Sequence, residues 1–134
     1  MVELSKSFEL EIETLDNDHK ELVTMANEIS ALLDQGNSGD CKDRLAQFIR
    51  FAKAHFSREE RLLLKVGYPN VEKHHRHHKE LDLKMEHMLE FAESAGLNEQ
   101  ARESLKKELV FFIMDDVITT DLDFKDFVKS KKTE

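Results

Sequence analysis

Residues 73–81 read KHHRHHKEL and place four histidines within five positions. Neighbouring residues of an α-helix point about 100° apart, so these four imidazoles cannot all face one place. Steps of three and four residues put His74 and His78 on the apolar line of this helix. The same steps put His75 and His77 on its charged face. We therefore expect the first pair to face a core and the second pair to face solvent.

The composition around this stretch favours helices. The chain has 134 residues, 40% of them hydrophobic, with four Gly and one Pro. This predicts one all-α domain spanning residues 1–134. Breaks fall at DQGNSGD, GYPN and SAGLN. They divide the chain into four predicted helices, over about 17–35, 40–66, 70–94 and 98–118.

These helices are close to 20 residues each, hence about 30 Å long. Short connections between helices of equal length predict an up-down-up-down four-helix bundle. An extended N-terminal arm precedes it and a short basic end follows. Asn98 is the expected N-cap of the last helix.

Charge and hydropathy exclude several classes of function. A net charge of -8 argues against nucleic acid, whose phosphates need clustered Lys and Arg. No run of about 18 apolar residues predicts a membrane span, and the N-terminus lacks the apolar core of a secretory signal. Cys41 stands alone in a polar connection, which predicts an incidental exposed thiol and a reducing compartment. We expect a cytoplasmic protein, either a monomer or a small homo-oligomer.

Every predicted helix carries polar residues on its apolar stripe. Buried imidazoles and carboxylates are costly unless they are paired or bind a metal, so several that converge in one core indicate a shared cation. Mixed imidazole and carboxylate ligands without thiolate suit iron, with zinc or manganese possible. The seven candidate ligands are His19, His55, Glu59, His74, His78, Asp116 and Asp121.

Two of these candidates, Asp116 and Asp121, do not share a face of an ideal helix, because five residues separate them. Both can face the core only if the chain loosens or bulges between them. The intervening VITT is β-branched throughout, which lowers helix propensity and favours such a distortion.

Three motifs in this order and spacing resemble the hemerythrin family, most closely the single-domain bacteriohemerythrins. LDNDHKEL (15–22) is similar to the family's D-x-x-H-x-x-L element. HFSREE (55–60) is similar to H-F-x-x-E-E, and GYPNVEKHHRHH (67–78) to Y-P-x-x-x-x-H-x-x-x-H. The resemblance covers nearly the whole chain.

This resemblance implies a non-haem diiron site, with two iron ions bridged by oxo or hydroxo, that binds O2 reversibly. Carried over residue by residue, it assigns one iron with an open position to His19 and His55. It assigns the other iron to His74 and His78. Glu59 and Asp121 would bridge the two.

The chain departs from the family at DVITTD (116–121), where the family usually reads H-I-x-x-x-D. Asp116 stands in the place of a third terminal histidine of the second iron. An anion in place of a neutral imidazole should favour the ferric state and lower the reduction potential. The sequence therefore predicts a site that forms but oxidises readily, with a less stable O2 adduct.

Two other classes of function stay open. A diiron redox enzyme or detoxifier would act on peroxide or NO at such a site. A ferritin-like oxidase is disfavoured, because it needs two inward Glu-x-x-His motifs and only EKHH (72–75), which faces outward, fits. A bundle without metal, such as a phosphotransfer or interaction module, would need an exposed histidine or surface rather than core-facing imidazoles.

Overall fold

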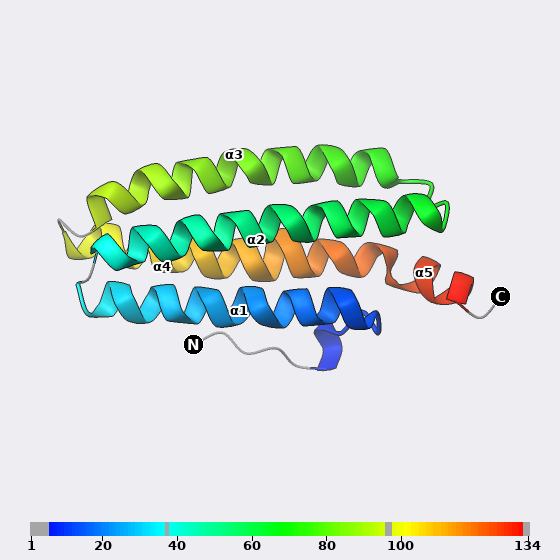
Figure 1. Ribbon diagram of the computed structural model, residues 1–134, viewed down its shortest axis with the longest axis horizontal. Coiled ribbons are helices and arrows are strands. Elements are labelled where there is room, and N and C mark those ends of the chain that lie inside the picture. The colour runs from blue at the N-terminus through cyan, green and yellow to red at the C-terminus, as the bar shows by residue number, and fades with distance from the viewer. Residues whose placement is uncertain (1–5, 37, 96–97, 133–134) are drawn as a thin grey trace.

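The computed structural model describes residues 6–36, 38–95 and 98–132, and none of these residues lies in a strand. Four antiparallel helices lie side by side along one axis (Figure 1). Each packs against its neighbours in the chain, and the first also packs against the last. This is the up-down-up-down four-helix bundle that the sequence predicts. The helices are α1 (Glu13–Asp34), α2 (Ser38–Lys65), α3 (Val71–Ala95) and α4 (Glu99–Phe111).

The fourth helix does not end near residue 118 as the sequence analysis expected. It passes into a π-helix, η2 (Phe112–Thr119), then a 3-10 turn, η3 (Leu122–Phe124), and a last helix, α5 (Lys125–Lys132). The C-terminal segment is helical because it has an apolar side: Phe124 and Val128 are fully buried. The short basic end expected from the sequence thus forms a helix, which the sequence analysis did not predict.

The π-helix lies where the sequence predicts a distortion. A π-helix closes its hydrogen bonds over five residues rather than four, so it widens the turn. Two threonine hydroxyls support this wider turn. Oγ1 of Thr119 donates to the carbonyl of Met114 at 2.6 Å, and Oγ1 of Thr120 donates to that of Asp115 at 3.3 Å. The threonines of VITT thus stabilise the irregular backbone directly.

The N-terminal arm is held against the end of the bundle, and α1 begins four residues earlier than expected. The arm's first five residues lie outside the described residues, and Lys6–Phe8 form a 3-10 turn, η1. The Asp16 carboxylate accepts hydrogen bonds from the backbone N–H of Leu10 at 2.8 Å and of Glu11 at 3.0 Å. Leu10 is fully buried.

Other local features follow from the helix boundaries. Asn98 caps α4 as predicted, accepting a hydrogen bond from the N–H of Ala101 at 2.6 Å. Cys41 is buried, contrary to the expected exposed thiol, because α2 already begins at Ser38 and turns this residue into the core. Burial raises the pKa of its thiol.

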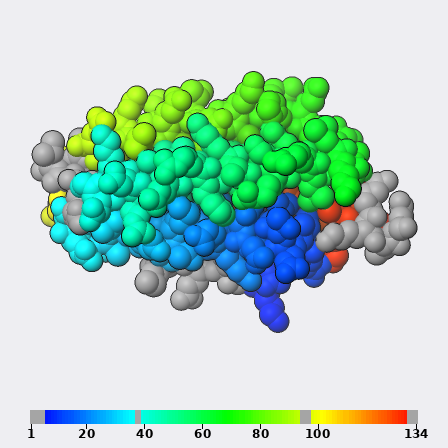
Figure 2. All heavy atoms as spheres, in the orientation of Figure 1, coloured from blue at the N-terminus to red at the C-terminus, as the bar shows by residue number. Residues whose placement is uncertain are grey.

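The apolar core is divided into two clusters along the bundle axis. The larger cluster draws on all four long helices, and the smaller one lies at the end of the bundle that holds the α2–α3 turn and α5. Most of the buried polar residues fall between the two clusters in sequence, whereas His55 lies at the edge of the larger one, next to Phe56. Side chains of α1, α2 and α3 form a continuous outer face over this interior (Figure 2). Among the described residues, no helix combines the length and apolarity needed to cross a membrane.

Candidate metal centre

Six of the seven candidate ligands come together in the interior, between the two apolar clusters. One comes from α1, two from α2, two from α3 and one from the turn that follows the π-helix. All six side chains are buried, and in order of their helices they are His19, His55, Glu59, His74, His78 and Asp121.

Glu59 lies at the centre of the cluster and divides its two oxygens between two groups of histidines. Oε2 lies 2.8 Å from Nε2 of His55 and 4.0 Å from Nε2 of His19. Oε1 lies 3.0 Å from Nε2 of both His74 and His78. One carboxylate thus faces imidazoles from three different helices.

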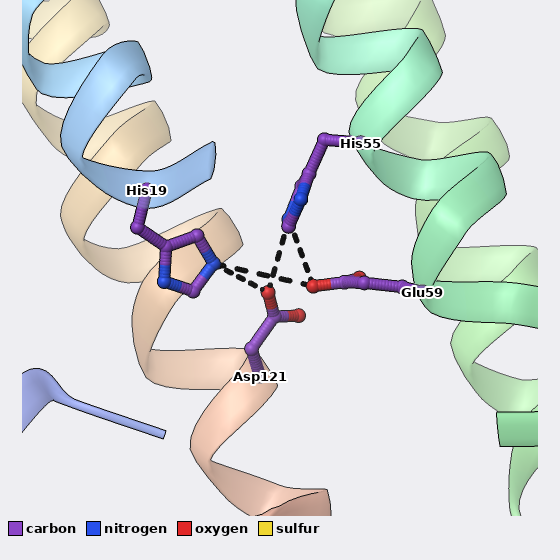
Figure 3. A group of neighbouring side chains, drawn as sticks. All are labelled: His19, His55, Glu59 and Asp121. Carbon is purple, nitrogen blue, oxygen red and sulfur yellow. Dashed lines mark hydrogen bonds and ion pairs between the residues drawn. The ribbon is translucent and has the colours of Figure 1, made fainter. Parts of the chain in front are cut away.

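Asp121 divides its oxygens in the same way. Oδ2 lies 2.8 Å from Nε2 of His19 and 3.3 Å from Nε2 of His55, whereas Oδ1 lies 3.3 Å from Nε2 of His74. Figure 3 shows Asp121 and Glu59 converging with the first pair of histidines. Each carboxylate therefore has one oxygen on each side of the cluster.

The result is two adjoining sets of donor atoms that share both carboxylates. Within each set, the four donor atoms lie within 4.8 Å of one another, close enough to hold a metal ion. We name the sets by their histidines: the first half contains His19 and His55, and the second half contains His74 and His78. Each half thus contains two imidazoles, and both halves share the carboxylates of Glu59 and Asp121.

A buried carboxylate orients His55 in the first half. Nδ1 of His55 donates to Oδ2 of Asp18 at 2.9 Å. Arg58 holds this carboxylate with two hydrogen bonds, each of 2.8 Å, from Nε and Nη2. Burial would raise the pKa of Asp18, but the hydrogen bonds from His55 and Arg58 lower it. Asp18 is therefore an anion, and it fixes the proton of His55 on Nδ1.

His78 has a similar but more exposed partner in the second half. Its Nδ1 donates to Oε1 of Glu60 at 3.2 Å, and the same oxygen also accepts from Nδ1 of His75. His75 is half exposed, as the sequence predicts for its face. On the other side, the ring of Phe56 stacks on the His78 ring with centroids 4.1 Å apart.

The cluster favours positive charge. Burial would lower the pKa of His55, but the charge of Glu59 and the hydrogen bonds that the ring donates to neighbouring carboxylates raise it well above its usual value. His74 behaves likewise: burial lowers its pKa, and hydrogen bonds with Asp121 and Glu59 raise it to about 9. In a metal-free chain, protons supply this charge.

The hydrogen-bonding pattern around the cluster suits a bound cation in place of the protons of the metal-free chain. Because the Nδ1 atoms of His55 and His78 donate outward, the inward Nε2 of each neutral ring is a lone pair. These lone pairs point at carboxylate oxygens about 3 Å away, which is repulsive without a positive ion between them. In the described chain, the buried Oε2 of Glu59 also has no hydrogen-bond partner. Nitrogen and oxygen donors of this kind suit iron.

The structure does not bring the seventh candidate, Asp116, to the cluster. Its Oδ2 lies 2.7 Å from Nζ of Lys84 on α3, and its side chain keeps 14% of its surface exposed. Asp116 is absent from both donor sets found among the described residues. The π-helix does widen the turn as predicted, but an exposed cation attracts this carboxylate outward.

His77 also differs from its expected position on a solvated face. Only 26% of its side chain is exposed, and Nε2 donates to the backbone carbonyl of Asp116 at 2.7 Å. Sequence reasoning also missed the two carboxylates that accept hydrogen bonds from Nδ1 of candidate ligands: Asp18, the partner of His55, and Glu60, the partner of His78. The sequence held a clue for Asp18, which lies on the apolar line between Leu15 and Leu22.

Comparison with known proteins gives consistent results. Residues 10–119 match the family model described as "Hemerythrin HHE cation binding domain". The chain is 32% identical over 77 residues to a bacteriohemerythrin of Campylobacter jejuni, a match that covers 56% of this chain and 57% of that protein. It is 34% identical over 83 residues to a bacteriohemerythrin of Clostridium acetobutylicum, covering 59% and 64% respectively. The chain thus spans less than two thirds of each relative's length.

The family match extends over most of the chain and contains both halves of the cluster except Asp121, which follows its end. The four long helices, the order of the motifs and the buried donor sets all agree with this match. The chain belongs to the hemerythrin family.

Proposed function

We propose that this chain is a non-haem diiron protein that binds O2, for carriage, storage or sensing, with residues 1–134 acting as one domain. The observation that carries the proposal is the pair of adjoining donor sets joined by two shared carboxylates. Two carboxylates that each direct one oxygen to either side suit a pair of metal ions better than a single ion. In this proposal His19 and His55 would hold one iron, His74 and His78 would hold the other, and Glu59 and Asp121 would be shared by both.

The protein's own residues position the ligands and exclude water. Asp18 and Arg58 fix the tautomer of His55, and Glu60 does the same for His78. The apolar clusters on either side of the site keep water from approaching along the bundle axis, which would limit proton leakage to a bound ligand. A pair of ferrous ions, when bound, supplies the electrons that O2 needs in order to bind reversibly.

The test is iron loading with optical spectroscopy. Metal-free protein is supplied with ferrous iron without air, separated from excess metal, and analysed for iron per chain. Its spectrum is then recorded before and after exposure to O2, and again after O2 is removed. We expect two irons per chain and an absorption change that reverses. Folded protein that takes up no iron, or iron-loaded protein whose absorption spectrum does not change on exposure to O2, contradicts the proposal.

We further propose that the site oxidises readily. Asp116 leaves the second half with two imidazoles instead of the family's usual three. In addition, His74 lines a surface groove of about 420 Å³ together with polar residues, which gives solvent a route to this half. Admission of water and protons favours oxidation of a bound ligand complex. The lone cysteine, a free thiol, suits the reducing cytoplasmic setting that we propose.

The same opening favours a second candidate function, a diiron redox enzyme or detoxifier that acts on peroxide or NO. The groove beside His74 carries Lys73 and Asn70 at its rim, so polar small molecules can approach. Turnover separates the two functions. Catalytic consumption of peroxide or NO by iron-loaded protein supports the enzyme, whereas stoichiometric binding without consumption supports the O2-binding protein.

A further inference from the structure

Asp116 occupies a position from which it can reach either the metal cluster or the surface. Asp116 lies five residues before Asp121, within the π-helix and the turn that follows it. A π-helix has a wider turn than an α-helix, so residues five apart lie nearer to one face than they would in an α-helix. The Asp116 carboxylate thus starts one turn away from a residue shared by both halves of the cluster.

Two residues of α3 fix the outward arrangement. His77 anchors the Asp116 backbone carbonyl at 2.7 Å, while Lys84 pairs with the carboxylate at 2.7 Å. The Lys84 ammonium also lies 5.4 Å from the centre of the Phe111 ring, which restrains the lysine side chain near α4. The backbone anchor does not involve the Asp116 side chain. Lys84 is therefore the contact that determines where this carboxylate points.

Solvent reaches this ion pair. Half of the Lys84 side chain is exposed, and both partners line a groove of about 430 Å³ between α3 and α4. The groove also carries Lys107 and Glu108, so its charges are mixed. An ion pair in such a setting is weak. Removal of the lysine charge would leave the Asp116 carboxylate without this partner.

We propose that Lys84 is a positioning residue that holds Asp116 away from the metals and leaves the second half open to a small exogenous ligand. This inference rests on the proposed diiron function. With Asp116 outward, each half has two imidazoles and the two shared carboxylates, so each half keeps room for one added ligand. Without the lysine, Asp116 turns inward and its carboxylate fills the place in the second half.

The probe is azide, titrated into iron-loaded, oxidised protein and followed by absorption. The natural chain should bind azide in two steps, one for each half. Lys84→Met should weaken the second step by about tenfold or more, the range found when a group that supports a metal site is removed. Lys84→Arg keeps the charge and should retain both steps.

A double-mutant cycle tests whether Lys84 acts through Asp116. Asp116→Asn lacks the anion that would enter the site, so it should bind azide in two steps. Lys84→Met should have no further effect in this background, because there is no carboxylate to release. A merely structural role for Lys84 would weaken azide binding in both backgrounds. Circular dichroism of each metal-free variant checks that the bundle remains folded.

The iron content distinguishes failure of this inference from failure of the proposed function. If the natural chain binds no iron, both the proposed diiron function and the role of Lys84 are contradicted. If every variant binds two irons but the natural chain takes up azide in one step, or Lys84→Met leaves both steps unchanged, the function stands and the role of Lys84 is overturned. An effect of Lys84→Met that persists with Asp116→Asn overturns it equally.

Discussion

The two halves of the cluster have the same number of imidazoles but differ in what surrounds them. In the first half, His55 donates to a buried carboxylate that Arg58 holds with two hydrogen bonds. In the second half, His78 donates to Glu60, which an exposed histidine shares. All four imidazoles are buried, so the two halves differ in the hydrogen-bond partner of the imidazole, which is buried in the first half and partly exposed in the second.

The largest effect should come from removing a residue that both halves share. Glu59→Ala should abolish iron binding in both halves, because each half loses one of its four donors and the bridge between them. Measurement of iron per chain tests this. The matched control, Glu108→Ala, removes an exposed glutamate and should retain the natural iron content. Retention of one full iron by Glu59→Ala would mean that the halves do not depend on a common carboxylate.

The next effect concerns the pH dependence of the metal-free chain. The pKa of His74 rises from 6.5 to about 9, and that of His55 rises as well. Protonation of His74 therefore stabilises the fold fully below pH 6.5, and this contribution disappears as the pH rises through about 9. For His74 it amounts to at most about 3 kcal/mol.

Urea unfolding of chelator-treated protein at several pH values measures this effect. The free energy of unfolding should fall between about pH 6.5 and 9. His74→Gln should reduce this change of the unfolding free energy with pH by the contribution of His74. The contribution of His55 in the first half should remain. A metal-free chain whose stability is constant or increases over this range would contradict the assigned charge of the cluster.

A smaller effect should distinguish the hydrogen-bond partners of the two halves. Asp18→Asn keeps an acceptor for His55 but removes the charge that Arg58 holds, and should weaken iron binding by about tenfold or more. Glu60→Gln is the matched change in the second half. Its effect should be smaller, because 24% of the Glu60 side chain is exposed and water can replace the interaction. Competition with a chelator measures both affinities, and the reverse ranking would contradict the difference in enclosure.

Helical periodicity was sufficient to predict the bundle and the residues that face its interior. His74 and His78 could be separated from His75 and His77 because a rigid helix assigns each position a direction. The prediction of a distortion before Asp121 was confirmed, since β-branched residues in sequence already weaken an α-helix. These features depend on local geometry, which a single sequence carries.

Sequence reasoning failed where a side chain had a choice of partners. Asp116 was a candidate ligand, with the alternatives that it leaves the iron without a ligand or reaches it through water; the sequence could not show that its carboxylate contacts Lys84, which lies 32 residues away on another helix. His77 was expected to face water, yet it contacts a carbonyl that the π-helix presents. Cys41 was expected to be exposed because polar residues surround it in the sequence, but it faces the core near the start of α2. Each of these outcomes depends on tertiary contacts or on a boundary that local patterns leave uncertain.

The smallest effect concerns the rate of oxidation, and it tests whether the open second half has a chemical consequence. Asp116→His introduces a neutral imidazole at the position where the family usually has one, and Lys84 has no reason to hold it outward. The added ring should close the second half to water and protons. Autoxidation should slow by up to about tenfold, which corresponds to about 1.4 kcal/mol in the barrier. Asp115→His, at the exposed neighbouring position, is the matched control and should oxidise like the natural chain.

The half-lives are compared by following the O2-dependent spectrum with time. Equal half-lives for Asp116→His and the natural chain would mean that the difference between the halves lies in structure alone and has no influence on how long a bound ligand survives.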